Sequence, residues 1–180
     1  MASRTDTRLV VDAATFAADR HRNQRRKDAD ATPYINHPLQ LAHVLMAEGD
    51  VDDVATIVAA ILHDTIEDTK TTREEIATRF GEEIASVVME VTDDKSIRDK
   101  AVRKQLQVEH APHLSPRARA VKLADKICNL RDVADSPPSG WELARRQEYF
   151  DWAKRVIDGL RGSYPKLERA FDEAYARRPR

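Results

Sequence analysis

The sequence predicts an all-α protein. Glycine occurs only five times in 180 residues, and stretches in which polar and apolar residues alternate, as they do in a half-buried strand, are rare. Apolar residues recur instead at intervals of three and four, which places them on one face of a helix. With 41% hydrophobic and 34% charged residues, the chain has the composition of a globular protein that can bury a core. We therefore expect one domain over residues 1–180.

The first third of the chain shows three helical segments. An apolar stripe at helical spacing is formed by Leu9, Val10, Ala13, Phe16 and Ala17. Pro38 suits the first turn of a second helix, which runs to about Gly49 and has His37 at or near its N-cap. A third helix starts at about Asp53, where an apolar run follows.

The middle of the chain carries clear start and stop signals. Either Thr71 or Thr72 can open a capping box, because each precedes a glutamate by three positions. Gly81 ends that helix, and another continues through Val91. A charged helix is expected to start at Ser96 and to reach about residue 111.

The last third is divided by prolines. Ser115 and Pro116 form an N-cap and first-turn pair for the next helix. Residues 137–140, Pro-Pro-Ser-Gly, are the strongest break in the chain. A long helix over 141–160 and an amphipathic helix from about Pro165 follow, and the tail 177–180 is expected to be frayed.

Charge and hydropathy exclude several classes of function. The net charge of −1 argues against broad electrostatic binding to nucleic acid or to an anionic membrane. No apolar run approaches the length of a membrane span, and the N-terminus lacks the apolar region of a signal peptide. The single cysteine, Cys128, leaves no intrachain disulfide to form. We expect a cytoplasmic protein.

Four potential metal ligands are spread over three segments. They are His37, the adjacent pair His63 and Asp64, and Asp125. Two imidazoles and two carboxylates suit Mn²⁺ or Fe²⁺ in an octahedral shell with positions left open for water or substrate. A metal held in this way is a reactive centre rather than a structural one. The spacings are too long for a local finger, so a tertiary fold must assemble the site.

Two further carboxylates follow the His-Asp pair. On a helix, Glu67 lies one turn after His63 and Asp68 one turn after Asp64, so either could orient or deprotonate a water molecule at the metal. The alternative is an exposed acidic helix end. His37 could likewise be a capping residue, and Asp125 could form a salt bridge with Lys122 or Lys126.

A basic stretch near the N-terminus suits a phosphate-bearing ligand. Five cations and no carboxylate occur between positions 20 and 27, namely Arg20, Arg22, Arg25, Arg26 and Lys27. They either bind phosphate oxygens or complement the end of a helix. Tyr34 could stack on a base, and Asn129 could bind a sugar hydroxyl. Arg145 and Tyr149 form an i, i+4 pair, for which core packing of Tyr149 is the alternative.

These motifs together resemble one family. The chain is similar to the small alarmone hydrolases of the HD superfamily and to the hydrolase domain of RelA/SpoT enzymes. The segments that carry the resemblance occur in the family's order from about residue 10 to 172. They are residues 21–28 (HRNQRRKD), 32–38 (TPYINHP), 62–69 (LHDTIEDT), 91–95 (VTDDK), 121–126 with 129–131 (VKLADK and NLR), and 147–150 (QEYF).

The resemblance implies an HD-domain helical bundle with a metal site in its centre. It implies that Mn²⁺ is held by His37, His63, Asp64 and Asp125, and that Glu67 and Asp68 serve catalysis. The nucleotide pocket then includes Arg26, Lys27, Tyr34, Lys122, Asn129, Arg145 and Tyr149. A lysine of the family corresponds to either Arg98 or Lys100.

The implied reaction is hydrolysis of the 3′-pyrophosphate of (p)ppGpp to GDP or GTP and pyrophosphate. No synthetase domain follows in this sequence, so we expect degradation of alarmone without synthesis. Three alternatives stay open at this point: hydrolysis of (p)ppApp, removal of the 2′-phosphate of NADPH, and an alarmone-binding module without catalysis. The oligomeric state is also open.

Overall fold

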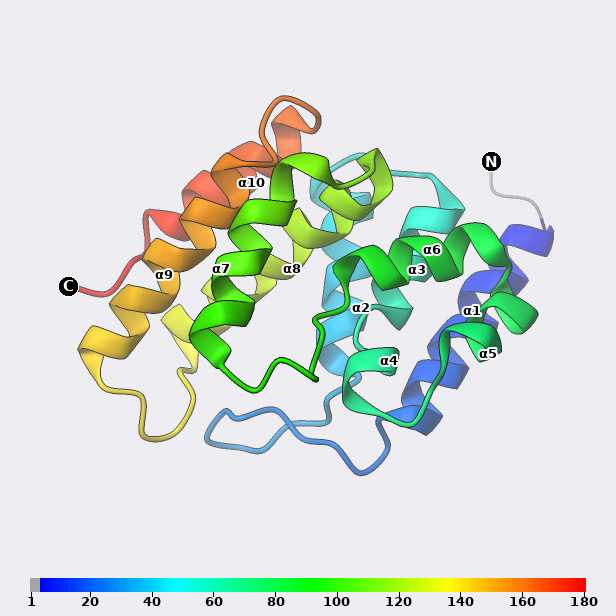
Figure 1. The fold of residues 1–180 in the computed structure, drawn as a ribbon, viewed down its shortest axis with the longest axis horizontal. Coiled ribbons are helices and arrows are strands. Elements are labelled where there is room, and N and C mark those ends of the chain that lie inside the picture. Colours follow the sequence, from blue (N-terminus) through cyan, green and yellow to red (C-terminus); the bar gives the residue numbers. More distant parts are fainter. Residues whose placement is uncertain (1–3) are drawn as a thin grey trace.

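A computed structural model gives the fold of residues 4–180, which is helical throughout (Figure 1). The elements are α1 (Arg4–Arg20), α2 (Asn36–His43), a π-helical segment (Val44–Glu48), α3 (Val54–Leu62), α4 (Thr65–Asp68), α5 (Arg73–Phe80), α6 (Glu82–Val91), α7 (Lys100–His110), a 3₁₀ turn (Ala111–His113), α8 (Pro116–Asp135), α9 (Leu143–Asp158) and α10 (Pro165–Tyr175). Within this range there is no β-strand, only an isolated bridge between Arg25 and Pro33. The all-α prediction is confirmed.

Side-chain caps fix the starts of three helices where the sequence predicted them. Asp53 caps α3, Thr72 caps α5 by accepting a hydrogen bond from the Glu75 amide, and Ser115 caps α8. Thr72 is therefore the capping residue of the two candidates. Gly81 separates α5 from α6 with φ of 97°, a conformation that favours glycine.

One predicted helix start differs from the structure. The charged helix α7 begins at Lys100 rather than Ser96, because the Asp99 carboxylate caps it by accepting from the Ala101 amide at 2.7 Å. Ser96 lies in a preceding turn, where its amide donates to Asp94. His37 lies inside the first turn of α2, whose N-cap is Ile35.

Helix α8 is the centre of the fold. It packs against α2, α3, α6, α9 and α10, and its apolar residues include the fully buried Leu123, Ile127 and Leu130. In Figure 1, α1, α5 and α6 lie on one side of it, and α7 and α9 on the other. The arrangement places the middle of α8, where Asp125 is found, between the two groups of helices.

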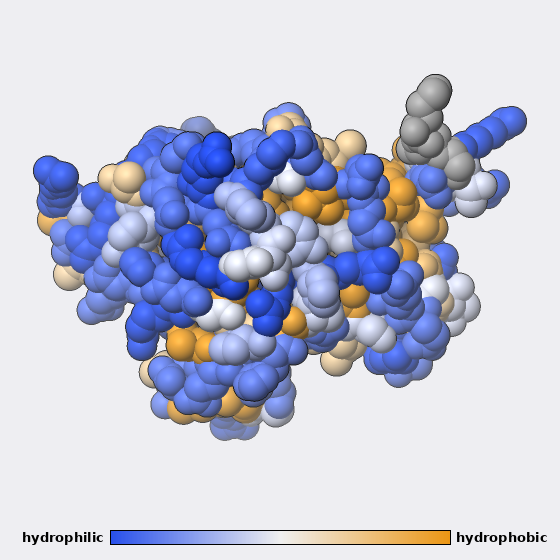
Figure 2. Space-filling view, turned by 90° about the horizontal axis from the view of Figure 1, so that it is seen from above, coloured by the Kyte–Doolittle hydropathy of each residue, from blue (hydrophilic) through white to orange (hydrophobic). Residues whose placement is uncertain are grey.

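The outer surface is mostly polar. The face in Figure 2 is largely covered by hydrophilic residues, with scattered apolar patches between them. Over residues 4–180, no helix combines the length and the apolar character needed to cross a membrane.

The C-terminal tail leaves the last helix but has contacts of its own. The Arg178 guanidinium donates to both carboxylate oxygens of Asp151 at 2.8 Å, and the Gln147 side chain donates to the Pro179 carbonyl at 3.1 Å. Within the tail expected to be frayed, Arg178 and Pro179 thus contact α9.

Replacing Asp53 by asparagine should make the protein less stable at neutral pH. Asp53 caps α3 and also accepts from the Arg117 guanidinium at 2.7 Å, which lowers the pKa of its carboxyl to about 2. Asparagine keeps the cap and removes the charge. Because the pair is more than a third exposed, we expect a loss of about 0.5–1 kcal/mol in the free energy of unfolding.

The contribution of this ion pair to the free energy of unfolding should depend on pH. The folded carboxyl has a lower pKa than the unfolded one, so its contribution is complete above about pH 5 and is lost as the pH falls through 4 towards 2. Urea unfolding of both proteins between pH 7 and 3.5 measures this. A stability difference that does not shrink at low pH would contradict the assigned ion pair.

Candidate active site

A polar cavity of about 350 Å³ opens beside the middle of α8. Its walls come from the segment before α2, the end of α3, α4, the segment after α6, and helices α7, α8 and α9. Every residue predicted from the sequence to bind metal or to catalyse lines it. The fold thus brings together residues that are far apart in the chain.

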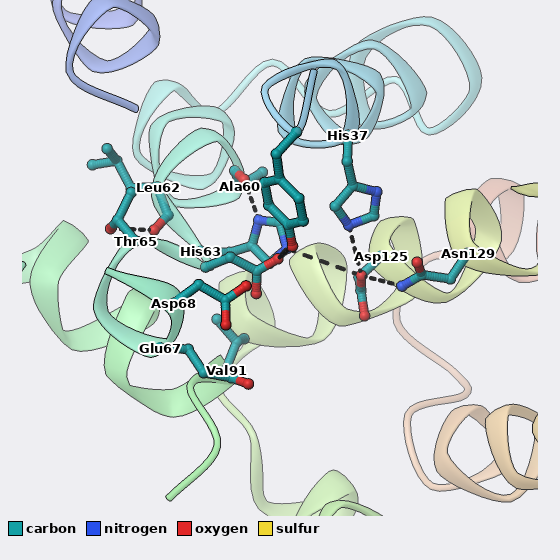
Figure 3. Close-up of polar contacts among 12 residues, drawn as sticks. His37, Ala60, Leu62, His63, Thr65, Glu67, Asp68, Val91, Asp125 and Asn129 are labelled. Carbon is teal, nitrogen blue, oxygen red and sulfur yellow. Dashed lines mark hydrogen bonds and ion pairs between the residues drawn. The ribbon is translucent and has the colours of Figure 1, made fainter. Parts of the chain in front are cut away.

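Three of the four predicted metal ligands form a compact group. Ligand atoms of His37, His63 and Asp125 lie within 4.8 Å of one another. His37 extends from α2 towards α8, and its Nε2 lies 3.2 Å from Asp125 Oδ1 (Figure 3). Both histidines are buried: 2% of the His37 surface and 5% of the His63 surface are exposed to solvent. This group could hold a metal ion.

The orientation of His63 suits a cation at the cavity. Its Nδ1–H donates to the Ala60 carbonyl at 2.8 Å, so Nε2 faces the carboxylates, where it contacts Asp64 as an ion pair and makes no aligned hydrogen bond within the described residues. Burial lowers the pKa of His63, but the charge of Asp64, whose Oδ2 lies 2.9 Å from Nε2, outweighs it and raises the pKa to about 9. Nε2 is thus the ring atom that a metal cation can contact. The donor set therefore fits a divalent metal.

Asp64 lies beside this group and outside it. Its Oδ2 contacts His63 and accepts a hydrogen bond from the Tyr34 hydroxyl. Burial opposes the charged form of Asp64, yet the positive charge of His63 lowers the pKa of the carboxyl below its ordinary value. Asp64 is thus a carboxylate that stays ionised within reach of the group.

Asp125 is held by residues of its own helix. The Asn129 side-chain amide donates to Oδ1 at 2.6 Å, and the Lys126 ammonium donates to Oδ2 at 2.9 Å. Burial raises the pKa of Asp125, but Lys126 and the hydrogen bond to His37 bring it well below the ordinary value. Asp125 therefore forms both the salt bridge to Lys126 and the contact to His37.

Glu67 and Asp68 differ in their surroundings. Glu67 accepts one hydrogen bond, from the Asp93 amide at 3.1 Å, and burial followed by the charge of Asp64 raises the pKa of its carboxyl. Both oxygens of Asp68 are engaged, one by the Gln24 amide at 2.8 Å and the other by the Lys95 ammonium at 2.5 Å. Glu67 is the carboxylate better placed to accept a proton, because its other oxygen, Oε1, makes no hydrogen bond within the described residues and lies 3.8 Å from the Lys95 ammonium.

The predicted nucleotide-binding residues divide into paired and unpaired groups. Arg26 donates to Asp132 at 2.5 Å and to Asn129 at 3.3 Å, and its guanidinium lies 5.7 Å from the centre of the Tyr34 ring. Lys27 lines the same cavity, is exposed, and forms no ion pair within the part of the chain that the structure describes. Lys27 is therefore free to meet an anionic ligand.

Tyrosines bound the cavity at two places. The Tyr34 ring packs on His21, with centroids 4.8 Å apart, besides contacting Asp64 through its hydroxyl. Tyr149 lies between Trp141 and Trp152, at 5.5 and 5.3 Å, and burial raises the pKa of its phenol to about 12. Both rings line the cavity, so the pure core-packing alternative for Tyr149 does not describe it.

Not all residues predicted to bind the nucleotide line the cavity. Arg145 is exposed, its guanidinium lies 4.5 Å from the centre of the Trp141 ring, and it does not line the cavity. Lys122 does line it, but its ammonium donates to the Val91 carbonyl at 3.0 Å. Neither Arg98 nor Lys100 reaches the cavity, and both are exposed.

Sequence reasoning missed several residues of the site. Asp93, Gln107 and Lys126 line the cavity, although only Lys126 had been considered, as an ion-pair partner. His21 does not line the cavity; it is 2% exposed, and its Nδ1 donates to the Gln24 side-chain oxygen at 2.7 Å. Gln107 gave no signal because a glutamine in a charged helix ordinarily faces solvent, whereas Asp93 stands in one of the family's segments.

Comparison with known proteins places this geometry in a family. A family model described as HD domain matches residues 13–151. The protein named guanosine-3′,5′-bis(diphosphate) 3′-pyrophosphohydrolase MESH1 from Xenopus tropicalis is 53% identical, over 95% of this chain and 95% of its own. Its namesake from Homo sapiens is 50% identical over 94% of each chain.

A solved structure shows the same fold. It is described as a metazoan ortholog of SpoT that hydrolyzes ppGpp and plays a role in starvation responses. It superposes with a TM-score of 0.92 at 43% identity, over 99% of this chain and 97% of its own. The match of fold and sequence shows the membership: this chain belongs to the HD domain family, and within it to the group of the MESH1 relatives.

Proposed function

We propose that this protein is a Mn²⁺-dependent hydrolase that removes the 3′-pyrophosphate of (p)ppGpp. The observation that carries the proposal is that His37, His63 and Asp125 meet in one polar cavity beside the carboxylate of Glu67. The names of the relatives, which are 3′-pyrophosphohydrolases of guanosine-3′,5′-bis(diphosphate), point to the same substrate.

The metal would be held by His37, His63, Asp64 and Asp125. Nitrogen and carboxylate donors together suit Mn²⁺, although such donors accept other divalent ions as well. When bound, the metal supplies positive charge that polarises the phosphate and lowers the pKa of water. Asn129 and Lys126 keep the Asp125 carboxylate in place for this role.

Glu67 would accept the proton of the attacking water. Its raised pKa moves it towards the range in which a carboxylate can take up and release a proton near neutral pH. Water adds to the phosphorus attached to the 3′ oxygen, the P–O3′ bond breaks, and the 3′ oxygen takes a proton as pyrophosphate leaves. Asp68 is held by Gln24 and Lys95. It would keep the neighbouring carboxylates of the cavity, Asp64 and Glu67, in position.

Replacing Lys27 by alanine should weaken nucleotide binding without changing metal content. A charge-assisted hydrogen bond to phosphate contributes roughly 1.5–3 kcal/mol, which corresponds to a loss of about ten- to a hundredfold in affinity. Binding of ppGpp to the Glu67→Gln protein, with and without the Lys27 change, measures this by calorimetry. Arg22→Ala is the matched control, because Arg22 is an exposed cation of the same segment outside the cavity. Equal affinity of the Lys27 and Arg22 variants would show that Lys27 only solvates the surface.

A substrate panel with Mn²⁺ tests the proposed reaction itself. We expect turnover of ppGpp and pppGpp with release of intact pyrophosphate. Faster turnover of pppApp would move the specificity to adenosine alarmones, and release of orthophosphate from NADPH would favour the 2′-phosphatase. Binding of ppGpp without turnover would favour the alarmone-binding module. Incubation of GDP or GTP with ATP tests the expected lack of synthesis.

A further inference from the structure

Residues 91–93, which hydrogen-bond to Glu67, are themselves held by side chains of α7 and α8. Residues 91–93 lie at and just beyond the end of α6, and the Asp93 amide donates to Glu67 Oε2 at 3.1 Å. The Lys122 ammonium of α8 donates to the Val91 carbonyl at 3.0 Å. The side-chain amide of Gln107 in α7 donates to both carboxylate oxygens of Asp93, at 2.8 and 2.7 Å. A chain of hydrogen bonds thus runs from Gln107 through Asp93 to Glu67.

The orientation of the Gln107 amide is set by this contact. Its Nε2 faces the carboxylate of Asp93, while its Oε1 is buried and has no hydrogen-bond partner in the described residues. A buried acceptor without a partner is unfavourable, so the two bonds to an ionised group must outweigh it. Turning the amide over would place its oxygen against the carboxylate. The contact therefore has one stable arrangement.

The rest of α7 does not explain the contact as ordinary packing. None of its residues is fully buried, and it lies against α9 and the 3₁₀ turn that follows it. Asp93 and Gln107 both line the cavity that contains the candidate metal ligands. The pair is therefore a polar link between a peripheral helix and the acidic wall of the active site.

We propose that Gln107 is a positioning residue for Glu67, which it holds through Asp93. The inference rests on the proposed function in that Glu67 is taken as the proton acceptor. Gln107 does not touch the reacting atoms. It keeps residues 91–93 in the conformation that fixes one oxygen of Glu67. The other oxygen lies 3.8 Å from the Lys95 ammonium, beyond hydrogen-bond distance, and can still contact water.

Three variants of the same residue test the link. Gln107→Met keeps the length of the side chain and removes the donor, and we expect kcat to fall by about ten- to a hundredfold with KM within about twofold of wild type. Gln107→Lys restores a donor to Asp93 and should recover most of kcat. Gln105→Met is the matched control, since Gln105 is an exposed residue of the same helix that bonds only to Glu109. Manganese content should be the same in all of them.

A double-mutant cycle separates positioning from a general structural role. If Gln107 acts through Glu67, Gln107→Met should have little further effect on kcat when Glu67 is already glutamine. The backbone amide resonance of Asp93 should shift in Gln107→Met and remain near its wild-type position in Gln105→Met. The same factor of loss in both backgrounds, lost manganese, no rescue by lysine, or wild-type kcat in Gln107→Met would overturn the inference.

The two proposals can fail separately. If the wild-type protein does not hydrolyse ppGpp under any metal condition, the proposed function fails. The Asp93 amide resonance still reports whether Gln107 controls the hydrogen bond to Glu67, because that measurement needs no substrate. Unchanged Asp93 resonances in Gln107→Met would defeat the inference even in an active enzyme.

Discussion

Substituting Asp125 by asparagine should remove bound Mn²⁺ and turnover together. Asp125 supplies the charged oxygen that faces His37 at 3.2 Å and His63 at 4.0 Å. Without that charge, two imidazoles and Asp64 remain, a weaker set for a hard divalent ion. Asparagine keeps the shape of the side chain, whereas alanine would also leave the buried Lys126 without its partner.

Metal content by elemental analysis and turnover of ppGpp measure this effect. We expect turnover in the variant at background level, and wild-type protein stripped with a chelator should recover when Mn²⁺ is added. Asp135→Asn is the control, because Asp135 is an exposed carboxylate of the same helix that pairs with Arg177. Full activity of metal-stripped wild-type protein would show that the reaction does not need a metal.

The second large effect is expected at Glu67. Glutamine keeps the size of the side chain and can still accept from the Asp93 amide, but it cannot take a proton from water. Loss of a general base lowers turnover by about 10²–10⁴-fold. Because Glu67 is outside the group of metal-ligand candidates, bound Mn²⁺ and the affinity for ppGpp should remain near wild type.

Product analysis completes this test. The wild-type protein should release pyrophosphate and leave GDP from ppGpp. Normal turnover by Glu67→Gln would move the catalytic role to Asp68, although both oxygens of Asp68 already have partners. Loss of manganese from Glu67→Gln would instead assign Glu67 to the metal shell.

Local signals in the sequence were sufficient for most of the fold. Asp53, Thr72 and Ser115 cap the helices that their positions predicted, because capping depends on neighbours within three residues. The start of α7 was predicted at the wrong residue because Ser96 and Asp99 can both cap a helix. In the structure Ser96 lies in a turn closed by Asp94, and Asp99 is the cap.

The candidate site was predictable only in part. Histidines and carboxylates are common metal ligands and can be recognised in a sequence. The structure brings His37, His63 and Asp125 together as expected. Side-chain direction was not predictable. Arg145 is one helical turn from Tyr149 but stacks on Trp141 instead, and Gln107 points inwards from a charged helix. Such choices depend on tertiary contacts that a single sequence does not display.

The distribution of the ligand residues along the chain bears on how the protein matures during synthesis. His37 and Asp125 are 88 positions apart, and α8 follows seven α-helices, α1 to α7. A nascent chain that ends before α8 contains both histidines but neither Asp125 nor the core of Leu123, Ile127 and Leu130. Bringing these distant segments together closes a long loop, which costs conformational entropy. The packing of α8 offsets this entropic cost. The cavity with its candidate metal ligands can therefore be complete only when α8 is in place, and a chain that ends before α8 lacks Asp125, one of the three residues of that group.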